Sequence, residues 1–177
     1  KVKQFSETFA DCTSLESIPE KLLAACTEIT TVKGMFHGCT SLATIPADLF
    51  STCVAITSFE TTFAECSSLK SIPEELFHAI GTKTSSVTFS ECFAECTSLE
   101  SIPASLFDTV RRINYIDSCF TGCVSLTGES PYTLITAEDG TERKVHLYER
   151  ERGDDFPNAP VSKSAHAECF AGCTGLT

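Results

Sequence analysis

Long apolar runs and an excess of positive charge are both missing from this sequence of 177 residues. No stretch of about 18 consecutive apolar residues occurs, so no transmembrane helix is expected. The chain has 13 lysines and arginines against 24 aspartates and glutamates, which gives a formal net charge of −11. Such a surface repels phosphate backbones and anionic lipid headgroups. We therefore expect no nucleic-acid partner and no direct insertion into a membrane.

Motifs that carry catalysis or hold cofactors are also missing. The sequence contains no glycine-rich phosphate loop, no G-x-S-x-G and no H-E-x-x-H. Its four histidines occur at unrelated phases of the chain and join no recognised motif: His37, His78, His146 and His166. We therefore expect the protein not to be an enzyme, with no catalytic residue, no cofactor and no metal site.

What the sequence does contain is an internal repeat. The phrase FADCTSLESIPEKLL, which begins at Phe9, returns almost unchanged as FAECTSLESIPASLF from Phe93. A cysteine three residues before a leucine recurs at intervals of 27, 27, 30, 27 and 50 residues. These cysteines are Cys12, Cys39, Cys66, Cys96, Cys123 and Cys173. A fixed period of this length is typical of units that stack into a solenoid, because one unit alone cannot bury its apolar edge.

Each repeat predicts two short strands and one short helix. The first strand is Ser-Leu-x-x-Ile, and it ends at a proline that cannot donate to a ladder. The same proline suits the first turn of a helix, so short helices are expected over 21–25, 48–52, 75–79 and 105–109. The second strand carries Ile29/Val32, Ile56/Phe59, Phe89 and Ile113/Ile116. Twelve of the 13 phenylalanines fall in regular columns, and we expect them to form the core.

The 11 cysteines fit packing better than disulfides or metal. One column of equivalent positions reads Cys26, Cys53, Ile80, Val110, and another reads Thr8, Met35, Thr62, Cys92, Cys119, Cys169. A position that exchanges cysteine for isoleucine, valine, methionine or threonine needs a small filler, which a buried free thiol supplies. In the invariant column the stacked Cβ vectors run parallel, which is poor disulfide geometry. Occasional disulfides and a metal site stay open as less favoured alternatives.

The pattern FAECTSLESIP at 93–103 resembles the repeat of BspA-type leucine-rich-repeat bacterial surface proteins. The resemblance covers residues 1–126 and 166–177. It implies an α/β repeat: a leucine-rich-repeat-like, right-handed solenoid of about 27-residue coils, with short parallel strands and short helices. It also implies display at the cell surface or secretion, a role in adhesion, and no shared catalytic residues.

The repeat breaks after Leu126, where Glu129 and Ser130 replace the expected isoleucine and proline. Strands are predicted at 132–136 and 144–149 around Asp139-Gly140, a strong hairpin signal, followed by a loop at 153–160. We interpret the chain as a single domain with coils at 1–126, a C-terminal hairpin insertion at 127–165 and a final partial repeat at 166–177. The hairpin either covers an exposed end or flank of the stack, which we favour, or contacts a ligand.

The function predicted from these features is non-enzymatic binding of a protein or glycan of host or matrix origin, by a monomer. The alternative is a structural spacer or display scaffold in a larger surface protein. The chain opens on Lys1 without an apolar leader, so we expect a processed piece of a longer product. Candidate contact residues lie between the core columns: Thr31, Ser58, Tyr115, Tyr148 and Arg150.

Overall fold

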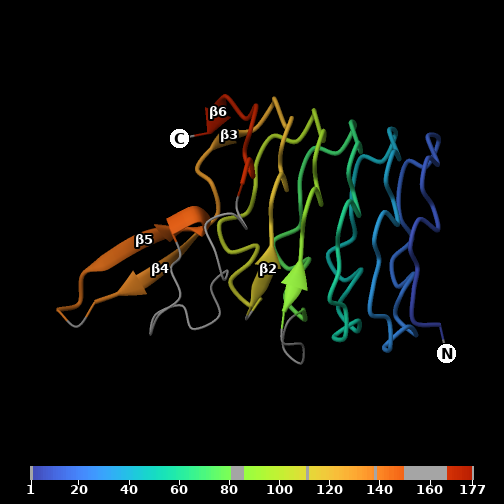
Figure 1. Cartoon of the computed structure of the whole chain (residues 1–177), viewed down its shortest axis with the longest axis horizontal. Helices are drawn as coiled ribbons and strands as arrows, with labels where there is room; N and C mark the ends of the chain where they lie inside the picture. The colour runs from blue at the N-terminus through green and yellow to red at the C-terminus, as the bar shows by residue number, and fades with distance from the viewer. Residues whose placement is uncertain (1, 81–85, 111, 138, 150–166, 177) are drawn as a thin grey trace.

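The computed structural model of the chain describes residues 2–80, 86–110, 112–137, 139–149 and 167–176. Figure 1 shows successive coils of the chain lying side by side from the N-terminus, with a hairpin that extends beyond them at the opposite end. We number the coils 1 to 6 by the phenylalanine that each contributes to the central column. These residues are Phe9, Phe36, Phe63, Phe93, Phe120 and Phe170.

Two parallel backbone ladders join the coils. The first contains the paired strands β1 (Val87–Thr88) and β2 (Ile113–Tyr115). Single parallel bridges continue it back to coil 1: Gln4–Thr31, Thr31–Ser58 and Ser58–Thr88. The second ladder contains the paired strands β3 (Thr127–Gly128) and β6 (Gly175–Leu176), with bridges at Ser17–Thr44 and Ser71–Ser101. The parallel pairing matches the prediction, although most of the paired positions are single bridges rather than strands.

The predicted short helices are wrong. Among the described residues the only helical element is the 3₁₀ turn η1 (Leu147–Glu149). Residues 21–25, 48–52, 75–79 and 105–109 form turns instead. Each turn begins with a hydrogen bond in which a leucine N–H donates to the carbonyl of the proline three residues earlier. Leu49 donates to Pro46 in this way at 3.2 Å. Five residues are too few to offset the cost of helix nucleation, so the described coils are a strand-and-turn repeat rather than an α/β one.

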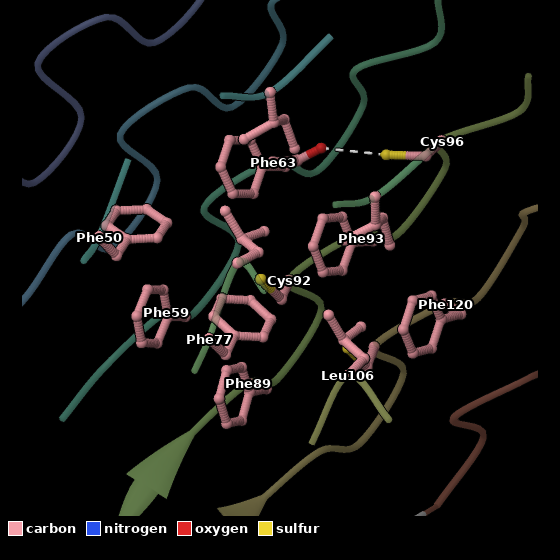
Figure 2. Close-up of a cluster of buried hydrophobic side chains, with 14 of the residues drawn as sticks. Phe50, Phe59, Phe63, Phe77, Phe89, Cys92, Phe93, Cys96, Leu106 and Phe120 are labelled. Atoms are coloured by element: carbon pink, nitrogen blue, oxygen red, sulfur yellow. Dashed lines mark hydrogen bonds between the residues drawn. The ribbon is translucent and has the colours of Figure 1, made fainter. Parts of the chain in front are cut away.

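Phenylalanine rings form the centre of the core, as the sequence predicts. The six rings of the central column stack nearly parallel, with neighbouring centroids 5.4–5.5 Å apart and interplanar angles of 1–8°. Rings from the turns meet this column edge-on: Phe50 lies 6.3 Å from Phe63, and Phe107 lies 6.4 Å from Phe120. Figure 2 shows how these rings interleave between coils. Removing one ring therefore affects the coils on both sides.

The predicted hairpin is present, with a different second strand. Strand β4 (Tyr132–Thr136) matches the expected range, and β5 (Glu142–His146) begins and ends earlier than expected because η1 follows it. The base of the hairpin is anchored: Val145 is 2% exposed and Leu147 is 0% exposed. Leu134, in contrast, is 55% exposed, because β4 and β5 extend beyond the coils. The predicted loop at 153–160 lies outside the described residues.

Candidate functional site

Three of the five predicted contact residues lie on one ladder. Thr31 is bridged to Ser58, Ser58 to Thr88, and Thr88 to Tyr115, so the row crosses coils 2 to 5 without interruption. Thr31 and Ser58 are half-buried, and Tyr115 is 50% exposed. We call the side chains of this row, with Gln4 of coil 1, the ladder face. Tyr148 belongs to η1 rather than to this ladder, and Arg150 lies outside the described residues.

The sequence directs these side chains outward because the next residue of each coil enters the core. Val32, Phe59, Phe89 and Ile116 follow the ladder residues directly, and all four are buried. Adjacent threonines support the row with their hydroxyls: Thr57 Oγ1 donates to the Thr30 carbonyl at 3.2 Å, and Thr30 Oγ1 donates to the Lys3 carbonyl at 3.2 Å. This supporting row was not predicted, although threonine recurs at Thr30 and Thr57 with the 27-residue period of the repeat.

The neighbouring surface is predominantly acidic. Lys33 Nζ lies 2.6 Å from Glu60 Oε1, and this hydrogen bond raises the lysine pKa. Ser90 donates a hydrogen bond of 2.6 Å to Asp117. Further carboxylates stand two residues before or after the central phenylalanines: Glu7, Asp11, Glu65, Glu91, Glu95 and Glu168. The ladder face is therefore flanked by negative charge, which disfavours an anionic partner.

Two of these carboxylates lie against a glycine of the next coil. A Cβ on Gly38 would clash with the Asp11 carboxylate, and one on Gly122 would clash with the Glu95 carboxylate. Both glycines also have positive φ, 69° and 75°, which L side chains rarely adopt. A larger residue at either glycine would therefore have to displace the carboxylate of the preceding coil.

The thiols are built into the core. Nine of the 11 cysteines are buried and all 11 are free. Within the invariant column, each thiol from coil 2 onward donates to the carbonyl of the preceding coil's phenylalanine, as Cys96 does to Phe63 at 3.1 Å (Figure 2). The other four donors are Cys39, Cys66, Cys123 and Cys173, at 3.0–3.2 Å. Cys12, in coil 1, is exposed, so the prediction that this column packs in the core is wrong there.

Burial makes these thiols poor nucleophiles. It raises the pKa of Cys66, Cys123 and Cys169 to about 12, and it raises the pKa of Cys92, Cys96 and Cys119 well above the usual range. A nucleophilic cysteine needs the opposite, an accessible and stabilised thiolate. The arrangement therefore supports packing chemistry rather than covalent catalysis at these six positions.

A surface depression of about 370 Å³ lies at the turns of coils 2 and 3, and its lining was not predicted from the sequence. It is lined by Ala47, Asp48, Ser51, Glu75, His78 and Ala79. Among the described residues, no group of three or more histidine, cysteine, aspartate or glutamate side chains is placed to hold a metal ion. Within the same residues, no helix is long and apolar enough to cross a membrane.

Comparison with solved structures gives a distant similarity, whereas the two sequence comparisons give no match. No protein-family model matches the chain, and no curated protein matches it. The coordinates are similar to a leucine-rich repeat protein from Bacteroides ovatus ATCC 8483, with 19% sequence identity and a TM-score of 0.37. The alignment covers 73% of this chain and 35% of that protein, so this chain spans about a third of its length.

Proposed function

We propose that this chain is a non-enzymatic binding module that contacts a protein or glycan through the ladder face. The observation that carries the proposal is the continuous row from Thr31 to Tyr115. It presents hydroxyl and phenol groups on a backbone that neighbouring coils hold in register. A half-exposed tyrosine suits an interface, since its ring packs and its hydroxyl stays available for a hydrogen bond.

The charge of the side chains beside the ladder face limits the chemical class of the partner. Carboxylates such as Glu60 and Asp117 border the row, so a neutral or basic partner is favoured over a sulfated or phosphorylated one. We further propose surface display or secretion and an adhesive role, on the strength of the repeat pattern at 93–103, which resembles BspA-type surface proteins.

A two-panel binding screen tests the proposal. The wild-type chain is applied to a glycan array and to immobilised matrix proteins, together with Ser58→Arg on the ladder face and Ser71→Arg on the second ladder as the matched control. Both serines form single parallel bridges, and both variants add the same charge. We expect at least one ligand whose affinity falls by about tenfold or more for Ser58→Arg and Tyr115→Ala but is retained by Ser71→Arg.

Two results would count against the ladder face. A ligand that Ser58→Arg still binds with wild-type affinity would place the contact elsewhere on the molecule. An absence of binding to both the glycan array and the matrix proteins would favour a spacer or display scaffold, which needs no ligand of its own.

A further inference from the structure

Two rows of outward-facing side chains run along the stack on the side of the ladder face. The first row is the ladder face itself. The second lies two residues later in each coil, because alternate residues of an extended strand point to the same side. We call this second row the flanking row, and it consists of Lys33, Glu60, Ser90 and Asp117. The residues between the two rows are buried in the core, so the rows form one polar surface along the flank that carries β1 and β2 (Figure 1).

Hydroxyls of the ladder face are oriented by the backbone of their own coil. Thr31 Oγ1 accepts a hydrogen bond from the Lys33 N–H at 3.2 Å, and Ser58 Oγ accepts one from the Glu60 N–H at 3.5 Å. A hydroxyl that accepts from the backbone keeps its own proton for another acceptor. Within the described residues neither hydroxyl donates to a protein acceptor. The ladder face therefore presents hydrogen-bond donors to a ligand.

Carboxylates of the flanking row supply the matching acceptors. Glu60 Oε1 accepts from Lys33 Nζ at 2.6 Å, and Asp117 Oδ1 accepts from Ser90 Oγ at 2.6 Å. In the part of the chain that the structure describes, the second oxygen of each carboxylate accepts no hydrogen bond. Donors in one row thus lie beside acceptors in the other.

This arrangement matches a ligand that carries hydroxyl groups at a regular interval. A sugar hydroxyl donates and accepts at the same time, so it can accept from Thr31 or Ser58 while it donates to a carboxylate of the flanking row. Parallel pairing holds neighbouring coils about 4.8 Å apart, which is close to the advance per residue of an extended polysaccharide. One sugar residue can therefore lie over each coil.

Apolar surface on the ladder face suits a sugar better than a protein. Among the described residues, the exposed large apolar side chains are Val2, Tyr115, Val124 and Leu134, and Tyr115 alone belongs to the ladder face. The centre of a stable protein interface is enriched in aromatic, methionine and arginine side chains, whereas the ladder face offers a single ring. A sugar needs no more than this, because its C–H face packs against one aromatic ring while its hydroxyls bond to neighbouring polar groups.

From this geometry we propose that the ladder face and the flanking row bind an extended, neutral, β-1,4-linked glycan, which runs along the stack with one sugar residue over each coil. The β-1,4 linkage gives the straight ribbon that this register needs, and a neutral sugar avoids repulsion by Glu60 and Asp117. One sugar ring stacks on Tyr115. The glycan site rests on the proposed function, which it narrows from a protein or glycan to one chemical class.

Isothermal titration calorimetry with oligosaccharides tests the class of ligand. The probes are β-1,4-linked oligomers of glucose, mannose and N-acetylglucosamine, in lengths from the dimer to the hexamer. Maltohexaose, whose α-1,4 linkages curve the chain, is the shape control, and a hexamer of galacturonate is the charge control. For at least one β-1,4-linked series we expect the affinity to increase with length up to about four residues, because Thr31, Ser58, Thr88 and Tyr115 form the row. Both controls should bind at least about tenfold more weakly than the neutral hexamer of that series.

Matched threonine variants locate the site. Thr31→Val keeps the shape of the side chain and removes a hydroxyl of the ladder face. Thr44→Val makes the same change on the second ladder, where Thr44 forms a single parallel bridge with Ser17. We expect Thr31→Val to lower the affinity for the hexamer by about two- to tenfold and Thr44→Val to leave it unchanged. Tyr115→Phe should keep most of the affinity because the ring remains, whereas Tyr115→Ala should lose it.

Three results would overturn the glycan site: no β-1,4-linked probe binds, a control oligosaccharide binds as tightly as the neutral hexamer, or Thr31→Val and Thr44→Val bind the hexamer alike. Its failure can be told apart from that of the proposed function. If no probe binds while a matrix protein binds the wild type and not Ser58→Arg, the ladder face remains the binding surface and only the glycan is wrong. If a hexamer binds Ser58→Arg and the wild type equally well, both proposals are wrong.

Discussion

A thiol in the invariant column is a hydrogen-bond donor as well as a filler. Cys66 Sγ donates to the Phe36 carbonyl at 3.2 Å, and that carbonyl also accepts the Cys39 N–H at 3.2 Å. Cys53 belongs to one of the variable columns, and its sulfur lies farther from the nearest carbonyls, at 3.7–3.8 Å. Val110 occupies the equivalent position in another coil. The two columns therefore use the same side chain for different purposes.

Substituting valine at Cys53 and at Cys66 should distinguish a thiol that only packs from one that also donates a hydrogen bond. Cys53→Val reproduces a side chain that the fold already accepts, so its cost should stay below about 1.5 kcal/mol. Cys66→Val removes an S–H donor and adds a methyl group to a fully buried site, so the free energy of unfolding should fall by about 1–3 kcal/mol. Urea unfolding under reducing conditions measures both. Equal losses would show that the thiol hydrogen bond contributes nothing.

Raised thiol pKa values predict loss of stability in alkali. The folded chain holds the protons of Cys66, Cys123 and Cys169 up to a pKa of about 12, whereas unfolded thiols ionise near a pKa of about 8.5. The unfolded state then binds fewer protons, so the free energy of unfolding decreases as the pH rises from about 8.5 toward 12. Below that window these groups leave stability unchanged.

Urea unfolding at neutral pH and at about pH 10 measures the effect. Cys169→Thr introduces the residue that coil 3 has at the equivalent position. In this variant the free energy of unfolding should fall less between neutral pH and about pH 10. A free energy of unfolding that stays constant over this range would contradict the burial of these thiols.

The sequence predicted where the thiols lie better than what they do. Exchange of cysteine for isoleucine, valine, methionine or threonine identified the filler columns, because packing tolerates shape equivalents. The invariance of the column from Cys12 to Cys173 was a signal of a second requirement. Only the coordinates show that requirement to be a carbonyl of the preceding coil, because the sequence does not say how neighbouring coils are offset.

At the level of elements, the core depends on ring layers that neighbouring coils share. Phe63 stacks on Phe36 at 5.5 Å and on Phe93 at 5.4 Å, with Phe50 edge-on at 6.3 Å. Phe170 stacks on Phe120 at 5.5 Å, and its ring is half-buried. A ring inside the stack therefore supports more of the fold than one in coil 6.

Alanine substitutions at these two positions test the layering. Phe63→Ala should lower the free energy of unfolding by about 3–5 kcal/mol, because it leaves a cavity between two packed neighbours. Phe170→Ala should cost clearly less, since solvent already reaches that ring. Thermal melting compares them directly, and equal losses would contradict a layered core.

Element types were predicted unevenly, for physical reasons. The hairpin turn at Asp139-Gly140 was predicted correctly because its chemistry is local: Gly140 has a φ of 82°, and Asp139 accepts the Thr141 N–H at 2.9 Å. The short helices were predicted wrongly because proline followed by an acidic residue suits a helix and a single turn equally well. The ladder that joins Thr31, Ser58 and Tyr115 followed from the repeat, whereas Tyr148 does not share it.

At the scale of the whole molecule, the coils form a continuous stack whose backbone hydrogen bonds around the central phenylalanines run in one direction. The proposed binding function depends on this stack, since the ladder face needs the coils in register. Phe36, Phe63 and Phe93 donate their N–H groups to the next coil at 2.8–2.9 Å. The Phe170 N–H has no such partner within the described residues.

Native-state hydrogen exchange measures the protection of each amide in this stack. We predict slow exchange at the N–H groups of Phe36, Phe63 and Phe93, so that protection recurs with the period of the repeat, and fast exchange at the N–H of Phe170. Fast exchange at all four amides, or protection without the period of the repeat, would contradict the stack.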